Sequence, residues 1–255
     1  MTKGSVSDRR INAAENTFDI INYIMEQDEA TLGNIANEVD LTKSTVHTYL
    51  ATMMDRGFVR SHGNTYSLSL RFLEVGETVR GQIEGITILR DVLADVVNQT
   101  DGIAWFIVEE DGHAVFVEKA TGEDAVQPYG HIGRRTTLHD IAGGKAILAH
   151  LPEERLGEII ADRGLPAKTD RTITDRDELR HELERIREQG FAVNRGENLQ
   201  GWRAVASPII HEGTIFGSIA ASGPKHRMHD DRLTETIPDI VTAATNEIQL
   251  RFLSE

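Results

Sequence analysis

The chain has 255 residues, which is enough for two domains of ordinary size. It contains no cysteine, so disulfides, thiol catalysis and thiolate metal sites are excluded. Its formal net charge is −14, from 41 acidic and 27 basic residues, and this excess of carboxylates argues against non-specific attraction to nucleic acid.

Lysine is scarce in this acidic chain, and it occurs only at positions 3, 43, 119, 145, 168 and 225. Abundant carboxylates with few lysines are typical of proteins from salt-accumulating halophiles, although an ordinary acidic cytosolic protein is the alternative. No apolar run reaches about 18 residues, and the first residues form no signal-peptide core. We therefore expect a soluble cytoplasmic protein without a membrane partner.

The first forty residues predict two helices. Arg9 and Arg10 precede the first helix as a short basic arm, which suits either phosphate contacts or a solvated tail. From Ile11, apolar residues recur every three or four positions, and the stripe is wide enough to pack against a second subunit as well; it comprises Ile11, Ala14, Phe18, Ile20, Ile21, Ile24 and Met25. Thr31 is a suitable N-cap for the second helix, which ends near Val39.

Residues 42–54 predict a third helix after a turn of three residues. Thr42 is a suitable cap, Gly57 is a suitable C′ residue, and the apolar face consists of Val46, Tyr49, Leu50 and Met53. The opposite face is polar and almost uncharged, with mostly short side chains at Lys43, Ser44, Thr45, His47 and Thr48. Short hydroxyls and an imidazole reach base edges, and Lys43 suits a phosphate, whereas a plain amphipathic surface helix more often carries Glu and Lys.

A β-hairpin follows, with residues 58–61 and 65–68 flanking a turn at residues 62–64. Three helices followed by a hairpin predict a winged helix-turn-helix over residues 8–69, with Arg60 and Asn64 of the wing as further DNA-contacting residues. A winged helix that binds another protein is the alternative reading.

Four segments of this half resemble the IclR family of transcription regulators: residues 32–36 (Leu-Gly-Asn-Ile-Ala), 43–47 (Lys-Ser-Thr-Val-His), 57–59 (Gly-Phe-Val) and 66–76 (Tyr-Ser-Leu-Ser-Leu-Arg-Phe-Leu-Glu-Val-Gly). The resemblance implies a GAF-like effector-binding domain after the winged helix, a homodimer or tetramer, and double-stranded operator DNA as partner. The family often has arginine where this chain has Thr48, so the operator is expected to differ accordingly.

Residues 70–88 predict a linker helix loosened by Gly76, Gly81 and Gly85, because each glycine costs ~1 kcal/mol relative to alanine. The second domain is assigned to residues 89–255, and its first helix is predicted over residues 86–98. Strands are expected at residues 103–108, 114–119 and 126–129, a helix from Thr174 to Gly190, and a strand at residues 191–194. A second hairpin at residues 202–222 and a terminal helix over 233–253 complete an α+β domain.

Residues 133–149 resemble the segment of the family that lines its ligand pocket. Small residues at positions 143, 144, 146 and 149 allow a helix to lie close to a sheet or a ligand, and backbone N–H groups at residues 136–139 suit an anion. Lys145 is read as a helix-surface or domain-packing residue rather than a catalytic one. The resemblance implies effector-binding residues at Gly133, Leu138, His139, Asn194, Glu197, Ala204 and Ser222.

Two of these positions depart from the family, which often has an acid where Asn194 stands and a cysteine where Ala204 stands. Family effectors are small organic acids or aromatic degradation products. No cofactor, metal or catalytic residue is expected. The alternative is a metal sensor or an enzyme using the histidines at positions 131, 139, 211, 226 and 229, of which only His226 and His229 are spaced as a ligand pair.

Overall fold

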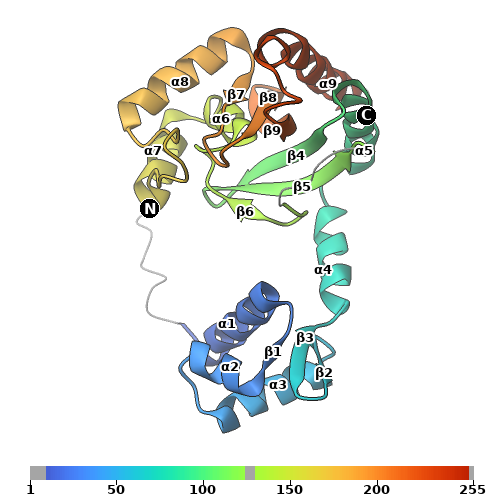
Figure 1. The fold of residues 1–255 in the computed structure, drawn as a ribbon, viewed down its shortest axis with the longest axis vertical. Helices are drawn as coiled ribbons and strands as arrows, with labels where there is room; N and C mark the ends of the chain where they lie inside the picture. Colours follow the sequence, from blue (N-terminus) through green and yellow to red (C-terminus); the bar gives the residue numbers. More distant parts are fainter. Residues whose placement is uncertain (1–9, 124–129, 253–255) are drawn as a thin grey trace. The chain divides into compact units, whose positions relative to one another are not determined.

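A computed structural model describes residues 10–123 and 130–252, and its contacts divide the chain into two units after Gln82. Figure 1 shows the elements of both units. The first unit contains four helices and three short strands: α1 (Asn12–Gln27), β1 (Ala30–Thr31), α2 (Leu32–Glu38), α3 (Lys43–Asp55), β2 (Val59–His62), β3 (Thr65–Leu68) and α4 (Arg71–Arg80). The expected strand at residues 126–129 and Arg9 lie outside the described residues.

Local capping explains where the second and third helices begin. The Thr31 hydroxyl accepts a hydrogen bond from the Asn34 N–H, and the Thr42 hydroxyl accepts one from the Thr45 N–H, both at 3.2 Å. Gly57 follows α3 with a φ of +77°, as expected of a C′ glycine. The predicted hairpin is confirmed, and β1 adds a third strand to it, giving the order β1-β3-β2 that the sequence did not predict.

The core of the first unit corrects the predicted face of α1. Ile20 and Ile24 are fully buried, but Ile11, Phe18 and Met25 are more than half exposed. Helical periodicity alone accommodates both stripes, and packing against α2, α3 and the sheet selects the one with Ile20 and Ile24. The exposed stripe is therefore an unpaired apolar face of this unit.

The predicted linker helix is interrupted. Helix α4 ends at Arg80, residues 81–85 are not helical, and α5 (Ile86–Thr100) begins after Gly85, whose φ is +67°. The contacts assign residues up to Gln82 to the first unit and those from Ile83 onward to the second. Glycines at 81 and 85 lower the stability of a continuous helix here, which fits the observed break.

The second unit is built on one antiparallel sheet in the order β6-β5-β4-β9-β8-β7. Its remaining elements are β4 (Ile103–Glu110), β5 (His113–Thr121), β6 (Arg135–Thr136), α6 (Ala142–Leu148), α7 (Glu153–Arg163), α8 (Arg176–Gln189), β7 (Ala192–Asn194), β8 (Trp202–His211), β9 (Thr214–Pro224), a π-helical turn (Arg232–Thr236) and α9 (Ile237–Phe252). Helices α5 and α9 cover one face of the sheet, and α6, α7 and α8 cover the other (Figure 1). The α+β prediction is thereby confirmed.

Strand alternation assigns side chains to the two layers. On β4, Trp105 and Ile107 face the layer of α6, whereas Ala104 and Phe106 face α5 and α9. The turn between β4 and β5 is Asp111-Gly112 with φ values of +50° and +77°, as a two-residue hairpin requires. Helix α8 is capped by Asp175, whose carboxylate accepts hydrogen bonds from the Asp177 and Glu178 N–H groups, so the helix begins at Arg176 rather than at Thr174.

Candidate functional site

The outward face of α3 consists of short polar side chains. Val46 and Leu50 are fully buried, while Lys43, Ser44, His47 and Thr48 are exposed and Thr45 is half-buried. The helix carries no carboxylate before Asp55. Short side chains allow the backbone of a helix to approach another molecule closely. This face of α3 also carries no negative charge that would repel an anionic partner.

Hydrogen bonds hold several of these hydroxyls in place. The Thr42 hydroxyl lies 2.8 Å from that of Thr45 and 3.0 Å from that of Ser44, and Thr48 donates to the Ser44 carbonyl at 3.1 Å. On the wing, Arg60 and Asn64 are exposed. Lys43 at the start of α3 and Arg60 on β2 are thus exposed positive charges of this unit.

The arm before α1 contributes less positive charge than its sequence predicts. Arg10 is exposed and contacts Glu15 at 3.4 Å, so its charge is partly offset. Arg9 cannot be placed, because the described residues begin at Arg10. Its assignment to DNA contact remains a prediction from the sequence.

A second site is an apolar cavity of about 80 Å³ between the sheet and the start of α6. A single water needs about 10–15 Å³ of such space, so the cavity has room for a small molecule. Its walls come from strands β4, β5, β7, β8 and β9, from α6 with the residue before it, and from the loops before β6 and β8. The lining residues are Trp105, Ile107, Phe116, Gly130, Arg134, Ile141, Ala142, Gly143, Asn194, Asn198, Leu199, Trp202, Ala204, Ala220 and Ser222.

Aromatic rings form one wall, and their positions are fixed. Trp105 and Phe116 pack edge to face with centroids 4.9 Å apart. The Trp105 indole N–H donates to the Ser222 hydroxyl at 3.3 Å, and that hydroxyl donates to the Ile103 carbonyl at 3.3 Å. Because both sides of the Ser222 hydroxyl are engaged, Ser222 orients Trp105 in the wall.

Glycine brings α6 against the sheet and the preceding turn. A Cβ atom on Gly143 would lie 2.6 Å from the Ile107 side chain, and one on Gly144 would lie 2.1 Å from the Leu138 carbonyl oxygen. No other residue fits at either position without movement of its neighbours. The predicted close approach is confirmed, but α6 starts at Ala142, so residues 136–139 do not form its N-terminus.

The loop from Asn194 to Leu199 is anchored to Asp140 beneath the cavity. The Asn194 amide donates to the Asp140 carbonyl at 2.6 Å and accepts from the N–H groups of Gly196 and Glu197. The Asn198 amide donates to the Asp140 carboxylate at 2.8 Å. Asn194 therefore shapes the loop, since both ends of its amide are bound to the backbone.

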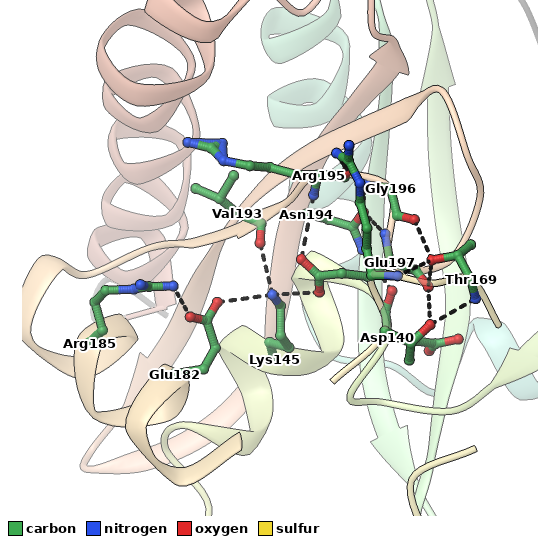
Figure 2. Close-up of polar contacts among 12 residues, drawn as sticks. Asp140, Lys145, Thr169, Glu182, Arg185, Val193, Asn194, Arg195, Gly196 and Glu197 are labelled. Carbon is green, nitrogen blue, oxygen red and sulfur yellow. Dashed lines mark hydrogen bonds and ion pairs between the residues drawn. The ribbon is translucent and has the colours of Figure 1, made fainter. Parts of the chain in front are cut away.

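A buried ion cluster fixes the other side of this loop (Figure 2). The Lys145 ammonium contacts Glu182 at 2.9 Å, Glu197 at 2.6 Å and the Val193 carbonyl at 2.9 Å. Arg185 also pairs with Glu182. Burial raises the pKa of Glu197, and the nearby Lys145 charge lowers it in part. Lys145 is a packing residue as predicted, but it is buried in the interior and does not lie on the helix surface.

Of the seven residues implied by the resemblance, Asn194, Ala204 and Ser222 line the cavity. The other four lie outside its lining. Gly133 is exposed beside β5, and Leu138 is a core residue. His139 lies 3.2 Å from the Pro166 carbonyl, and burial lowers its pKa. Glu197 points to Lys145.

Several cavity residues were not anticipated from the sequence: Trp105, Phe116, Arg134, Asn198, Leu199 and Trp202. The alternation of residues 103–108 does place Trp105 on the same face as Ile107, so this wall had a signal in the sequence. In the described part of the chain, no three His, Asp or Glu side chains gather in a way that could hold a metal ion. Among the same residues, no helix is both long and apolar enough to cross a bilayer.

Comparisons with known proteins cover both units of the chain. The helix-turn-helix model of the IclR family matches residues 13–63, and the model of the C-terminal domain of bacterial IclR transcriptional regulators matches residues 81–249. The probable HTH-type transcriptional regulator ArcR of Halobacterium salinarum is 33% identical over 248 residues, covering 95% of this chain and 94% of that protein. KdgR of Escherichia coli is 27% identical over 237 residues, covering 92% and 90%.

Solved structures share the fold across the whole chain. The Thermotoga maritima IclR crystal structure has a TM-score of 0.79 at 28% identity and covers 95% of this chain and 99% of that one. An IclR homolog from Microbacterium hydrocarbonoxydans, complexed with 4-hydroxybenzoate, has a TM-score of 0.78 at 21% identity and covers 95% and 100%.

A winged helix-turn-helix joined to an α+β domain with an apolar cavity defines a DNA-binding regulator with an effector-binding domain. The chain belongs to the IclR family of transcriptional regulators. Because the members of this family are regulators of transcription, the prediction of a non-enzymatic protein is confirmed.

Proposed function

We propose that α3 enters the major groove of operator DNA and that a small organic acid in the aromatic cavity controls this binding. The observation that carries the proposal is the outward face of α3, which is free of carboxylates in a chain with 41 of them. The protein would have one conformation that binds DNA and one that does not, and an effector that binds one of them more tightly would shift the population toward it.

Within this proposal, the residues of α3 and the wing have different roles. Lys43 and Arg60 neutralise phosphates, whereas Ser44, Thr45, His47 and Thr48 reach base edges and Asn64 contacts the backbone through the wing. Arg9 and Arg10 add phosphate contacts from the arm. A gel-shift titration on DNA upstream of the protein's own gene, over a range of salt concentrations, tests the proposal. Absence of a shifted band at every salt concentration would contradict it.

The lining of the cavity supports a compact acid with an apolar or aromatic body. Trp105, Phe116 and Trp202 supply flat apolar surface, and Arg134 supplies positive charge suited to a carboxylate. Isothermal titration with benzoate, 4-hydroxybenzoate and short aliphatic acids tests this class. We expect binding that saturates at one molecule per chain, and heat of dilution alone for every acid would contradict it.

Exposed apolar side chains support a homodimer. In the first unit, Ile11 and α1 expose one set of apolar side chains, Ile11, Phe18 and Met25. Around α4 a second set is exposed, Leu70, Leu73, Val75 and Val79. Such faces mark interaction surfaces when they are contiguous. Light scattering should give the mass of a dimer or tetramer, and Phe18→Glu should reduce it. A monomer at micromolar concentration would contradict this assignment.

The charge of the chain supports a protein adapted to high salt. Its proposed action on DNA places it in the cytoplasm. Carboxylates exceed basic residues by 14, and the chain is similar to ArcR of Halobacterium salinarum. Salt screens the repulsion among these carboxylates and between them and DNA. We therefore expect unfolding temperatures that rise between 0.2 and about 2 M KCl.

A further inference from the structure

A second cavity, of about 280 Å³, lies beside the aromatic one and has the opposite character. Its lining is Asp170, Arg171, Arg195, Gly196, Gln200, Gly201, Trp202, Arg203 and Lys225. Three separate stretches of the chain supply these residues, namely the segment before α8, the loop before β8 with the first two residues of β8, and the residue after β9. Four cations and one carboxylate line it, in a chain whose net charge is −14.

Three of these cations form no ion pair with the carboxylates that the structure describes. Arg203 is buried and pairs with Asp230 at 2.8 Å, so its charge is compensated. Arg171, Arg195 and Lys225 are exposed, and none of them forms an ion pair with a carboxylate of the described residues. The carboxylate of the lining, Asp170, accepts a hydrogen bond from Gln200 at 3.4 Å.

The cavity is also preorganised. An Arg171 N–H donates to the Arg195 carbonyl at 3.0 Å, which fixes the guanidinium and leaves its other donors for a ligand. The Lys225 N–H donates to the Gly201 carbonyl at 2.8 Å and extends the β8–β9 ladder by one residue. Gly196 and Gly201 have φ values of +100° and +75°, so the wall between the cations is backbone without side chains.

We propose that this cavity binds a small, multiply charged anion, either a phosphorylated metabolite or a polycarboxylate. Three cations around an open concave site, one of them held by a hydrogen bond, match such a ligand better than they match a single carboxylate. Arg171 can bind two anionic oxygens at once, and Arg195 and Lys225 supply charge from the other walls. The site would be distinct from the aromatic cavity and would take a ligand of different chemistry.

One loop connects the two cavities. Trp202 lines both, Asn198 and Leu199 line the aromatic cavity, and Gln200 and Gly201 line the basic one. Thr169 donates to the Gly196 carbonyl at 2.8 Å and Thr172 donates to the Glu197 carbonyl at 2.6 Å, which ties this loop to the segment carrying Arg171. Occupancy of the basic cavity would therefore change affinity at the aromatic cavity, and the reverse must hold equally. This coupling rests on the proposed effector site, whereas anion binding does not.

Calorimetric titration of the full-length protein tests the proposal. The probes are pyrophosphate, citrate and acetate, at constant ionic strength and pH. Saturable binding of pyrophosphate or citrate at one per chain, with acetate at least about tenfold weaker, is expected because affinity should grow with anion charge. A preference between the first two probes tells a phosphorylated ligand from a polycarboxylate. Equal weak binding of all three would overturn the proposal.

Variants locate the site. Arg195→Gln and Lys225→Glu should each weaken pyrophosphate or citrate binding by about tenfold or more, because each removes a charged partner of the anion. The matched control is Arg180→Gln, which removes an exposed arginine that pairs with Glu153 on another surface. Unchanged affinity in both site variants, or an equal loss in the control, would overturn the assignment. Unfolding temperatures confirm that the variants are folded.

A last comparison separates this proposal from the function proposed above. Ala204→Phe fills the aromatic cavity but removes no contact of the anion, since Ala204 does not line the basic cavity. Pyrophosphate or citrate should therefore still bind saturably at one per chain, with an affinity changed only by the coupling between the two cavities. If anion binding persists when no organic acid binds the aromatic cavity, the second site stands and the proposed effector fails. If anion binding is absent while the aromatic cavity is functional, only the second site fails.

Discussion

Lys145 and Glu197 form an ion pair of 2.6 Å inside the second domain, and this pair joins α6 to the loop that borders both cavities. Lys145 is fully buried and also contacts Glu182 (Figure 2). One ammonium therefore holds two carboxylates from different elements. The position of the loop depends on an interior charge, and the first prediction tests that dependence.

Replacing Lys145 by methionine should destabilise the second domain by about 3–5 kcal/mol, because Glu182 and Glu197 would lose the cation that compensates their burial. Denaturant unfolding followed by Trp fluorescence measures the change. Lys168→Met is the control, since Lys168 is exposed, and it should shift stability by less than about 0.5 kcal/mol. Equal effects of the two substitutions would contradict a structural role for Lys145.

Stability should fall as the pH drops below 6.5, partly because of His139. Burial lowers the pKa of His139 below its ordinary value of 6.5, so the folded state prefers the neutral ring. The unfolded chain takes up the proton first, and the contribution of His139, present above pH 6.5, is lost as the pH falls through the folded pKa. The difference in unfolding free energy between wild type and His139→Gln, measured from pH 8 to pH 5, should become smaller as the pH falls. A constant difference over that range would refute this linkage.

Gly144→Ala should destabilise the protein by about 1–3 kcal/mol, because the added methyl would meet the Leu138 carbonyl oxygen at 2.1 Å. Gly157→Ala is a matched control within α7, where an added Cβ has nothing within 4 Å. There the same substitution should stabilise by about 0.4–1 kcal/mol, since alanine loses less backbone entropy. Thermal unfolding of both variants gives the change in unfolding temperature relative to wild type. A change of the same sign in both variants would contradict the role of Gly144.

Ala204→Phe should abolish binding of an organic acid to the aromatic cavity while operator binding is retained. The ring would occupy most of a cavity of about 80 Å³. Ala204→Ser keeps the volume nearly unchanged and should bind the acid within a few-fold of wild type. Calorimetry and gel shifts measure the two activities separately. Normal acid binding by Ala204→Phe would place the effector elsewhere.

Lys43→Ala and His47→Ala should affect operator binding in different ways. Loss of a phosphate contact at Lys43 should weaken binding to all sequences alike and reduce the slope of log affinity against log salt by about 1. Loss of a base contact at His47 should cost about 1–3 kcal/mol on the operator and much less on unrelated DNA. Titrations at several salt concentrations distinguish the two. Identical profiles would contradict the assigned roles.

The elements that depend on neighbouring residues could be predicted from the sequence. Thr31 and Thr42 cap their helices, Gly57 ends α3, and Asp111-Gly112 makes the turn expected of a two-residue hairpin. Capping and turn formation involve residues only a few positions apart, so their chemistry is visible in the chain. The helix-turn-helix and its polar face follow from such local rules.

The face of α1 and the positions of charged core residues depended on the tertiary structure. Two overlapping apolar stripes on α1 satisfy the helical period, and only contact with other elements buried Ile20 in preference to Phe18. Burial of Lys145 likewise requires carboxylates from α8 and the loop after β7, which lie 37 and 52 positions away. Periodicity carries no information about such distant partners.

The aromatic cavity depends both on local sequence and on tertiary contacts. Amino-acid sequence alone determined that Trp105 shares a strand face with Ile107 and that small residues at 143 and 144 permit close packing. The tertiary structure alone decided that Phe116, Trp202 and Ser222 line one cavity with Trp105, because strand order and register bring those strands together. It also directed Glu197 toward Lys145 and out of the cavity lining, because a buried carboxylate is stabilised by an ammonium and destabilised by apolar surroundings.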